Sequence, residues 1–538
     1  MKKVVLASAL LTSAVALLSA STLARASNSN VPVIDLGYTQ YQGVFDSVNN
    51  LTNYLGIRYA APPTGNLRWR APRSPERNDS FVQQADTQPS PCFQSSGGAA
   101  STNALELNKR AGVDVTGEPT EDCLFLNVYF PGNTVPTELL PTLVWIHGGG
   151  YIGGSADQYS GSDLMREANN EIVVVIIQYR LGLFGFLSGS EIKANGSLNA
   201  GLLDQHFALR WVQSHISKFG GDPSKVTIWG ESAGAGSVLQ HIVAQDGQTS
   251  PQLFRGAITS STFLPSQYMY NDPIPESLYS TVVSQTNCTS AKDSLACLRA
   301  VDAAALEIVN GNVNVAGFYG TFVFVPVVDG SFITQRPTEA MKQGKVNGEA
   351  LLAVTNSNEG FIFVNQSNPI AASSYASNLF PKFGTEVANI TAQIYAPFGY
   401  SLEQDELIMG ESIFICPTYY LLSAFQNKAW KGEFAIPPAT HGSDAPYYFP
   451  SVESPPFNNS DFLAAFQGGF MSFVVSQDPN EKIAQTITPV WDLYSKNNIE
   501  MVFNKTIDNQ TDVHVDSTAN ALLERCKFWN DLGKLTGQ

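Results

Sequence analysis

A glycine-flanked serine at the end of a short apolar strand constrains this chain more than any other feature of its sequence. Residues 219–234 read FGGDPSKVTIWGESAG, so the predicted strand 226–229 runs into a G-x-S-x-G turn at 230–234. Such a turn passes sharply from strand to helix and holds the oxygen of Ser232 at its tip. The pentapeptide alone also fits an ordinary surface turn. Because a serine hydroxyl is a weak nucleophile, the catalytic interpretation requires a base and oxyanion donors elsewhere in the chain.

Strand-like and helix-like segments alternate around this turn. A near-continuous β-branched run such as 172–177 is typical of a strand buried on both faces of a parallel sheet. Further strands are predicted at 143–147, 226–229, 257–259 and 350–354, and a helix at 202–219. This alternation predicts an α/β fold with a mostly parallel central sheet and helices on both faces. The less regular segments 265–345 and 370–430 are predicted to cap the active edge of the sheet within one domain, 27–538.

The charge balance and the N-terminus indicate where the protein works. With 47 acidic and 31 basic residues the net charge is -16, which argues against nucleic acid or an anionic membrane surface as partner. Lys2 and Lys3 precede an apolar stretch at 4–18 and then small residues, so residues 1–26 are predicted as a secretory signal peptide, cleaved after residue 20 or 26. The stretch is short for a membrane span, although an N-terminal anchor is the alternative.

The cysteines and sequons agree with secretion. An even number of cysteines in an oxidising compartment predicts disulfides, and six of them allow 15 connectivities. None has the C-x-x-C spacing of a zinc or redox site. The cysteines are Cys92, Cys123, Cys288, Cys297, Cys416 and Cys526. Candidate glycosylation sites of the form N-x-S/T are Asn50, Asn78, Asn195, Asn287, Asn365, Asn389, Asn458, Asn504 and Asn509.

A glycine run supplies the candidate oxyanion donors. The predicted strand 143–147 ends in the sequence HGGGY, residues 147–151. Glycines directly after a strand leave backbone N–H groups free to point at a developing negative oxygen. We predict that the N–H groups of Gly149, Gly150 and Ala233 form the oxyanion hole. A plain tight turn is the alternative.

The base follows by elimination, because the chain has only six histidines. In an architecture with the order serine, acid, histidine, only His441 and His514 follow Ser232 with room for an acid between. His514 lies in a polar stretch, whereas His441 lies in a glycine-containing loop after the apolar segment 434–436, and loops that leave strands carry catalytic groups. We therefore predict His441 as the base.

The acid is expected at the carboxyl end of a strand between serine and histidine. Glu359 follows the predicted strand 350–354 and is our choice to orient His441 and to stabilise its imidazolium. Asp329 is the rival, although its Asp-Gly sequence favours a turn. Catalysis by a serine, a histidine and a carboxylate requires no metal or cofactor, and we predict none.

Taken together, these motifs resemble the type-B carboxylesterase/lipase family of α/β-hydrolases, which includes cholinesterases and fungal secreted lipases. The resemblance rests on the serine segment, on EDCLFLN at 121–127, on NYLGIRYA at 53–60 and on PVVDG at 326–330, and it spans about residues 31–535. It implies a secreted serine ester hydrolase with an α/β-hydrolase fold and a Ser232–His441–Glu359 triad. It also implies the disulfides Cys92–Cys123, Cys288–Cys297 and Cys416–Cys526.

Departures from the cholinesterase pattern narrow the substrate. The loop between Cys92 and Cys123 contains no tryptophan, so a cation–π contact to choline is lacking there. Tyr151, Gly320 and Phe322 are predicted to line the substrate pocket, and Gly320 stands where a cholinesterase has phenylalanine, which implies a roomier acyl pocket.

The loop between Cys92 and Cys123 corresponds to the lid of related fungal lipases, and its sequence in this chain favours an esterase. Its apolar residues Leu105, Leu107, Val113 and Val115 form only a weak amphipathic pattern, whereas an interfacial lid needs a clear apolar face. We therefore expect a carboxylesterase acting on small-molecule or lipid esters. A triacylglycerol lipase is the first alternative, and a non-catalytic binding or adhesion protein of the same fold is the second.

Overall fold

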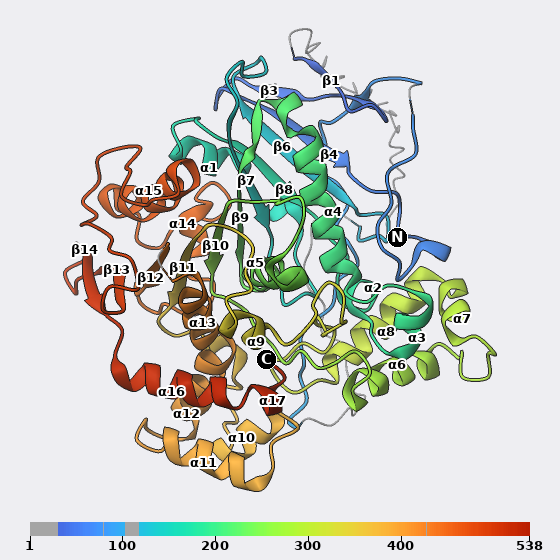
Figure 1. The fold of residues 1–538 in the computed structure, drawn as a ribbon, viewed down its shortest axis with the longest axis vertical. Coiled ribbons are helices and arrows are strands. Elements are labelled where there is room, and N and C mark those ends of the chain that lie inside the picture. The colour runs from blue at the N-terminus through green and yellow to red at the C-terminus, as the bar shows by residue number, and fades with distance from the viewer. Residues whose placement is uncertain (1–30, 79, 103–117, 427) are drawn as a thin grey trace, which may run out of the picture.

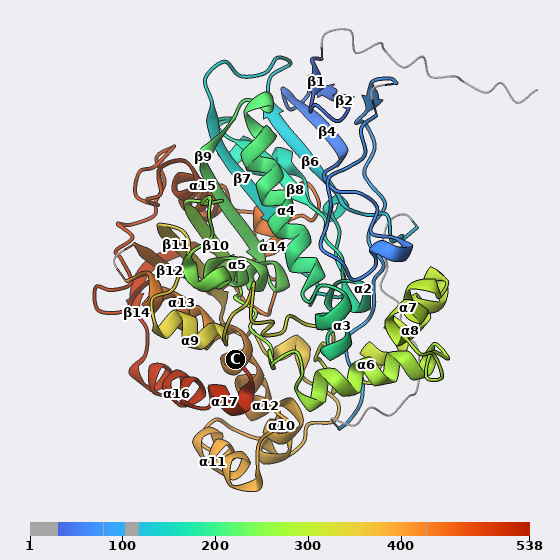
Figure 2. The same cartoon turned by 45° about the vertical axis from the view of Figure 1, so that its right-hand side comes forward.

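The computed structural model describes residues 31–78, 80–102, 118–426 and 428–538. The predicted signal peptide and residues 105–115, which were compared with the lids of fungal lipases, lie outside the described residues. Figures 1 and 2 show a long twisted sheet through the middle of the molecule with helices packed on both sides.

An eleven-stranded sheet forms the frame within the described residues, and a small sheet of order β1-β2-β5 lies beside it. The order of the large sheet is β14-β13-β12-β11-β10-β9-β7-β8-β6-β4-β3. The seven strands from β13 to β8 are parallel, and antiparallel pairs stand at both edges. The strands are β1 Val33–Asp35, β2 Gln40–Gln42, β3 Val44–Asp46, β4 Leu51–Arg58, β5 Gln83–Gln84, β6 Phe125–Pro131, β7 Leu140–Ile146, β8 Val173–Ile177, β9 Gly221–Glu231, β10 Gly256–Ser260, β11 Ala350–Asn356, β12 Ala429–Phe434, β13 Ile499–Lys505 and β14 Thr511–Ser517.

The predicted mostly parallel sheet is thus confirmed, with shifted element ends. The strand predicted at 226–229 is the last part of β9, which begins at Gly221 and pairs with β7 and β10. The helix predicted at 202–219 is α4, Ala200–His215, followed by a 3-10 turn, Ile216–Phe219. Tertiary pairing explains the longer strand, because β7 already begins opposite Gly221.

Helices cover both faces of the sheet. On one face lie α4, α5 and α13, and on the other lie α1 and α15 (Figure 1). The helices are α1 Gly161–Glu167, α2 Gly182–Phe186, α3 Ser190–Asn195, α4 Ala200–His215, α5 Ala233–Val243, α6 Pro273–Gln285, α7 Ser294–Ala300, α8 Ala303–Val315, α9 Pro337–Lys342, α10 Ala372–Leu379, α11 Thr385–Tyr395, α12 Ser401–Gly410, α13 Cys416–Phe425, α14 Ala445–Tyr448, α15 Ser460–Ser476, α16 Asn520–Asp531 and α17 Gly533–Thr536.

Side chains alternate between two hydrophobic cores along the central strands. In β7, Val144 and Ile146 belong to the core under α4 and α5, whereas Leu143 and Trp145 belong to the core under α1 and α15. Since all four are fully buried, the strand needs apolar residues at successive positions, which is the pattern of a parallel sheet covered on both faces.

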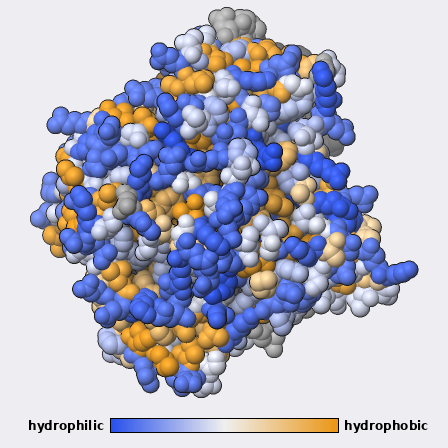
Figure 3. Space-filling model, viewed as in Figure 1, coloured by the Kyte–Doolittle hydropathy of each residue, from blue (hydrophilic) through white to orange (hydrophobic). Residues whose placement is uncertain are grey.

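The predicted capping excursions gather at one end of the sheet. Figures 1 and 2 show α6–α8 and α10–α12 grouped there, below the carboxyl end of β9. The helical stretch Ser401–Phe425 is apolar and long enough to cross a membrane, but most of it is buried inside the protein, as in the core helix of a globular fold. On the face shown in Figure 3, hydrophilic side chains predominate and hydrophobic ones form scattered groups.

Three disulfides cross-link the fold, and they are the three pairs that the family resemblance implied. Cys92–Cys123 closes a loop before β6, and Cys288–Cys297 joins the turn that follows α6 to α7. Cys416–Cys526 joins α13 to α16 across a separation of 110 residues. No free cysteine remains among the described residues.

Two neutral histidines under the sheet predict a loss of stability in acid. Burial lowers the pKa of His206 on α4 to about 4, with a further contribution from the charge of Arg210, and burial lowers the pKa of His241 on α5 to about 3. An unfolded histidine titrates near 6.5, so below that pH the unfolded chain binds more protons than the folded one. The free energy of unfolding should therefore be full above pH 6.5 and fall by up to about 1.4 kcal/mol per pH unit for each histidine between pH 6.5 and about 4.

Urea unfolding at several pH values between 4 and 7 measures this loss. The substitution His241→Gln removes one of the two groups, so the slope of unfolding free energy against pH should become shallower. An identical slope in the variant and the wild-type protein would contradict the assignment.

Candidate active site

Ser232 stands at the tip of a strained turn between β9 and α5. Its backbone has φ 56° and ψ −123°, a conformation that few non-glycine residues adopt. A Cβ at position 230 would lie 2.3 Å from the backbone of Gly234, and a Cβ at position 234 would lie 2.0 Å from the carbonyl oxygen of Ile146. The flanking glycines are therefore required by close backbone contacts, and the serine is held out at the carboxyl end of the sheet.

The structure brings Ser232, His441 and Glu359 together in one line of hydrogen bonds. The Oγ of Ser232 lies 2.8 Å from Nε2 of His441, and Nδ1 of His441 lies 2.6 Å from Oε2 of Glu359. Glu359 is fully buried, and its other oxygen accepts hydrogen bonds from the N–H of Asn356 and the hydroxyl of Ser261, both at 2.7 Å. This geometry can transfer the serine proton to Nε2 while the carboxylate holds the ring.

Contacts between two strand-end loops hold the acid beside the histidine. Glu359 follows β11 and His441 follows the neighbouring parallel strand β12, so both loops leave the same edge of the sheet. The N–H of Asn358 donates to the carbonyl of Ala439 at 2.8 Å, and its side-chain amide donates to the carbonyl of Pro438 at 2.7 Å. The two loops therefore form one unit.

Aromatic rings and carboxylates surround His441. Phe414 and Phe363 contact the imidazole, with ring centroids at 4.4 and 4.9 Å. Burial disfavours the charged imidazolium, but the negative charge and hydrogen bond of Glu359 outweigh it, so that the pKa of His441 is raised above 6.5. The ring is thus a stronger base than a free histidine.

Sequence reasoning assigned no role to Glu231 and Asp444, which the structure places at the site. Oε1 of Glu231 lies 3.4 Å from Nε2 of His441, and burial raises the pKa of this carboxyl to about 8 although His441 lowers it. Asp444 is fully buried, accepts hydrogen bonds from Asn356 and Tyr448, and its pKa is raised by burial. Glu231 stands in the GES segment and Asp444 in the THGSD segment, but no spacing in the sequence indicates that both carboxyls lie near His441.

The three predicted oxyanion donors lie on two segments that converge beside Ser232. Gly149 and Gly150 follow β7 with φ values of 101° and 63°, and Ala233 is the first residue of α5. Within the described part of the chain, no hydrogen bond is formed by the N–H groups of these three residues. A Cβ at neighbouring Gly148 would lie 3.1 Å from Cβ of Ser232, so the glycine turn touches the serine. Their assignment as an oxyanion hole stays a prediction.

An apolar cavity of about 320 Å³ adjoins these residues. Phe263, Phe322 and Ile413 are among its lining residues, and Gly320 lies beside them. Phe263 stacks on Phe414, the neighbour of His441, and a Cβ at Gly150 would lie 2.4 Å from the ring of Phe322. The cavity wall is therefore in contact with both the base and the oxyanion segment.

Two of the three predicted pocket residues line this cavity. Tyr151 is fully buried and packs on Phe263, with ring centroids at 5.8 Å, so it stands behind the wall. Gly320 lines the cavity, but a Cβ there would meet the carbonyl oxygen of Phe363 at 2.0 Å, and its φ is 73°. A backbone contact therefore requires this glycine, and the expectation of a roomier acyl pocket stays a prediction.

The remaining sequence candidates lie away from the serine or serve structure. His514 is exposed on β14 and pairs with Asp512. Asp329 is buried and accepts hydrogen bonds from the N–H groups of Ser331 and Phe332, so it caps a turn. All nine sequon asparagines are at least partly exposed.

Comparisons with known proteins agree with this architecture. A family model described as the carboxylesterase family matches residues 31–529. The carboxylesterase patB of Aspergillus clavatus is 30% identical over 94% of this chain and 97% of its own. The secreted triacylglycerol lipase LIP1 of Gibberella zeae is 35% identical over 63% of this chain and 60% of its own. Among solved structures, Aspergillus niger EstA superposes with a TM-score of 0.83 at 30% identity, covering 95% of this chain and 100% of that one.

The match runs over nearly all described residues, and the structural neighbours share the large, mostly parallel sheet flanked by helices. The chain therefore belongs to the carboxylesterase family and is a carboxylic ester hydrolase with an α/β-hydrolase fold.

Proposed function

We propose that this protein is a secreted serine carboxylesterase that forms an acyl-enzyme on Ser232. The observation that carries the proposal is the position of His441, whose two nitrogens contact Ser232 and Glu359 at 2.8 and 2.6 Å. Alignment of a nucleophile, a base and an orienting acid is the arrangement that acyl transfer requires. We propose further that residues 27–538 act as one domain.

The proposed reaction has two halves. Ser232 attacks the ester carbonyl while His441 takes its proton, and the negative oxygen accepts hydrogen bonds from the N–H groups of Gly149, Gly150 and Ala233. His441 then returns the proton to the leaving alkoxide, which leaves the acyl group on the serine. Water repeats the sequence, with His441 again as base, and releases the carboxylic acid.

A protonated Glu231 fits this cycle. With a pKa raised to about 8 by burial, its carboxyl is mostly protonated at neutral pH, although it lies 3.4 Å from Nε2 of His441. The charge that stabilises the imidazolium therefore comes from Glu359, on the far side of the ring from the serine. Nε2 stays available to the serine hydroxyl.

The cavity favours esters of short or medium apolar chains. Its volume of about 320 Å³ lies at the lower end of the range for pockets that enclose a small molecule, and its wall is mostly apolar. A long acyl chain would extend beyond it. This supports a carboxylesterase over a triacylglycerol lipase, although relatives carry both names.

Secretion is supported by three independent features. The N-terminal residues have the pattern of a signal peptide, the six cysteines form three disulfides, and several relatives are named as secreted lipases.

Hydrolysis of p-nitrophenyl acetate, butyrate, octanoate and palmitate, with emulsified triolein as lipase substrate, tests the proposal. We expect kcat/KM to rise with chain length by about fourfold per buried methylene, since each contributes about 0.8 kcal/mol, and then to fall once the cavity is full. Preference for triolein would favour the lipase, and no hydrolysis of any ester would refute the proposal.

The substitution Leu278→Trp tests whether acyl chains enter this cavity. Leu278 lines it from α6, and an indole would fill part of the space. We expect kcat/KM for the octanoate ester to fall by about tenfold or more, because several methylenes lose their contacts at about 0.8 kcal/mol each, while that for the acetate ester stays unchanged. An equal loss for both esters would show that the acyl chain lies elsewhere.

A further inference from the structure

A segment next to the first disulfide joins the oxyanion glycines to the substrate cavity. We call residues 92–100 the strap. Two of its contacts involve the side chain of Gln94, which donates from Nε2 to the carbonyl of Gly154 and accepts at Oε1 from the N–H of Gly154, both at 3.1 Å. The N–H of Ser95 donates to the carbonyl of Ile152 at 2.8 Å.

These contacts fall on the turn that carries the proposed oxyanion donors. The carbonyl of Gly149 accepts from the N–H groups of Ile152 and Gly153 at 3.0 and 2.9 Å, so residues 149–154 form one closed turn. Gly154 ends it with φ 97°, and a Cβ there would lie 2.5 Å from Nδ1 of His147. Because residue 154 itself cannot carry a side chain, the side chain of Gln94 supplies the hydrogen bonds that hold this end of the turn in place.

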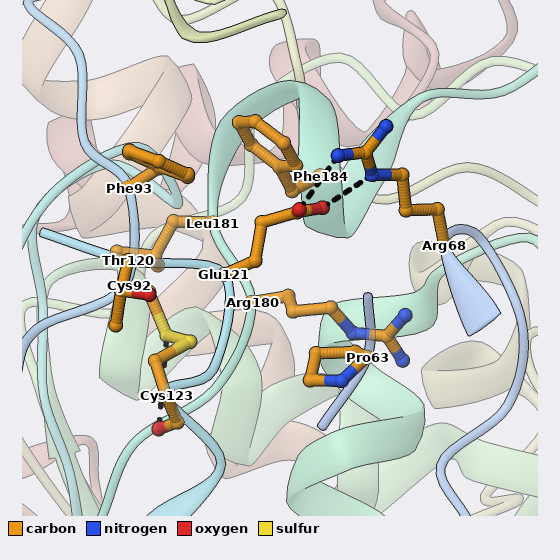
Figure 4. Close-up of a pocket in the computed structure, with 10 residues that line it drawn as sticks. All are labelled: Pro63, Arg68, Cys92, Phe93, Thr120, Glu121, Cys123, Arg180, Leu181 and Phe184. Atoms are coloured by element: carbon orange, nitrogen blue, oxygen red, sulfur yellow. Dashed lines mark hydrogen bonds and ion pairs between the residues drawn. A yellow bond between two sulfur atoms is a disulfide. The ribbon is translucent and has the colours of Figure 1, made fainter. Parts of the chain in front are cut away.

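Gln94 is itself held firmly. Two residues before it, Cys92 is bonded to Cys123, and the adjacent Phe93 stacks on Phe184 with ring centroids 5.0 Å apart. Figure 4 shows these residues beside the buried ion pair of Arg68 and Glu121. Only 8% of Gln94 is exposed.

The other half of the strap contacts the cavity wall. The N–H of Gly98 donates to the carbonyl of Thr321 at 2.8 Å, and the N–H of Gly320 donates to the carbonyl of Gly98 at 3.0 Å. The N–H of Ala100 donates to the carbonyl of Gly317 at 2.9 Å. The strap thus fixes the distance between the oxyanion turn and the loop that carries Phe322.

We propose that Gln94 is a positioning residue for catalysis, which holds the N–H groups of Gly149 and Gly150 where the oxyanion forms. This inference rests on the proposed function. Donors that are fixed before the reaction stabilise the transition state more than the bound ester, so losing the grip on Gly154 lowers kcat and leaves KM nearly unchanged. The two hydrogen bonds pair one donor and one acceptor on the same planar group, a pattern that among side chains only a carboxamide or a protonated carboxyl can form.

The first test is Gln94→Ala. We expect kcat for p-nitrophenyl butyrate to fall by about tenfold or more, and the affinity for an alkyl trifluoromethyl ketone, whose adduct with Ser232 places an anionic oxygen among the same donors, to fall by a similar factor. The matched control is Gln213→Ala. Gln213 also donates to two backbone carbonyls, those of Pro223 and Leu253, at 2.8 and 3.0 Å, but it lies at the far end of α4. Its loss should lower the melting temperature and leave kcat and the inhibitor affinity unchanged.

The second test is Gln94→Glu, which separates positioning from folding. A protonated carboxyl can donate to the carbonyl of Gly154 and accept from its N–H, as the amide does, whereas a carboxylate repels that carbonyl. The ratio of variant to wild-type kcat should therefore fall as the pH rises through the pKa of the introduced carboxyl. A purely structural defect would lower the ratio equally at every pH.

The outcomes separate this inference from the proposed function. Wild-type kcat in the Gln94→Ala variant, or a loss of kcat without loss of ketone affinity, would overturn the positioning role while the wild-type enzyme still hydrolyses esters. An inactive wild-type protein, or full activity without the Ser232 hydroxyl, would overturn the proposed function itself.

Discussion

Replacing Ser232 by alanine will lower kcat for ester hydrolysis by about 10⁴-fold or more. The substitution removes the oxygen that forms the acyl-enzyme, while the proposed oxyanion donors and the base remain. Water activated by His441 would have to attack the ester directly, without the positional advantage of a bound nucleophile. The remaining rate should be the small acceleration that an oxyanion site alone supplies.

Kinetics with p-nitrophenyl butyrate and mass spectrometry after a short reaction test this result. A transient acyl adduct should appear on the wild-type protein and be absent from the variant. The control is Ser224→Ala, which changes an exposed serine on the same strand, β9. Hydrolysis at the wild-type rate by the Ser232→Ala variant would remove Ser232 from the mechanism.

Replacing Glu359 by glutamine will lower kcat by about 10³- to 10⁴-fold, because the imidazole is forced into the wrong tautomer. The N–H of Asn356 and the hydroxyl of Ser261 both donate to one oxygen of Glu359, so a glutamine must keep its carbonyl oxygen on that side. Its NH₂ group then faces Nδ1 of His441 and makes that nitrogen an acceptor. The proton moves to Nε2, which can no longer accept the serine proton.

The same variant will change the pH dependence in a defined direction. His441 acts as a base only when neutral, so kcat/KM rises as the pH passes upward through its pKa. The charge and hydrogen bond of Glu359 are what raise that pKa above 6.5 against burial. The wild-type acid limb should therefore lie above pH 6.5, and the limb of the variant should lie at lower pH. The control Glu453→Gln changes an exposed carboxyl, and an unmoved limb in Glu359→Gln would contradict the orienting role.

Local patterns were sufficient for the frame of this molecule. A β-branched run is typical of a strand that is buried on both faces of a parallel sheet, and β8 is buried along its whole length and pairs in parallel with β7. Element ends were less predictable, because β9 gains its first residues from pairing with β7 and not from its own composition. Gly320 shows a second limit of prediction from the sequence. From the sequence, a missing side chain suggests only added space, whereas the structure shows that the close approach of the Phe363 carbonyl also requires a glycine there.

The sequence by itself determined the predicted triad and its order, because the G-x-S-x-G turn, the glycine run and the small number of histidines leave few assignments. Only the tertiary structure revealed Glu231 and Asp444 beside His441, and Gln94 behind the oxyanion turn. These residues act through contacts between segments 60 to more than 200 positions apart in the chain, as in the pair of Gln94 with Gly154 and the approach of Glu231 to His441. A motif records spacing along the chain, whereas burial, charge and hydrogen bonding depend on which segments the sheet brings together.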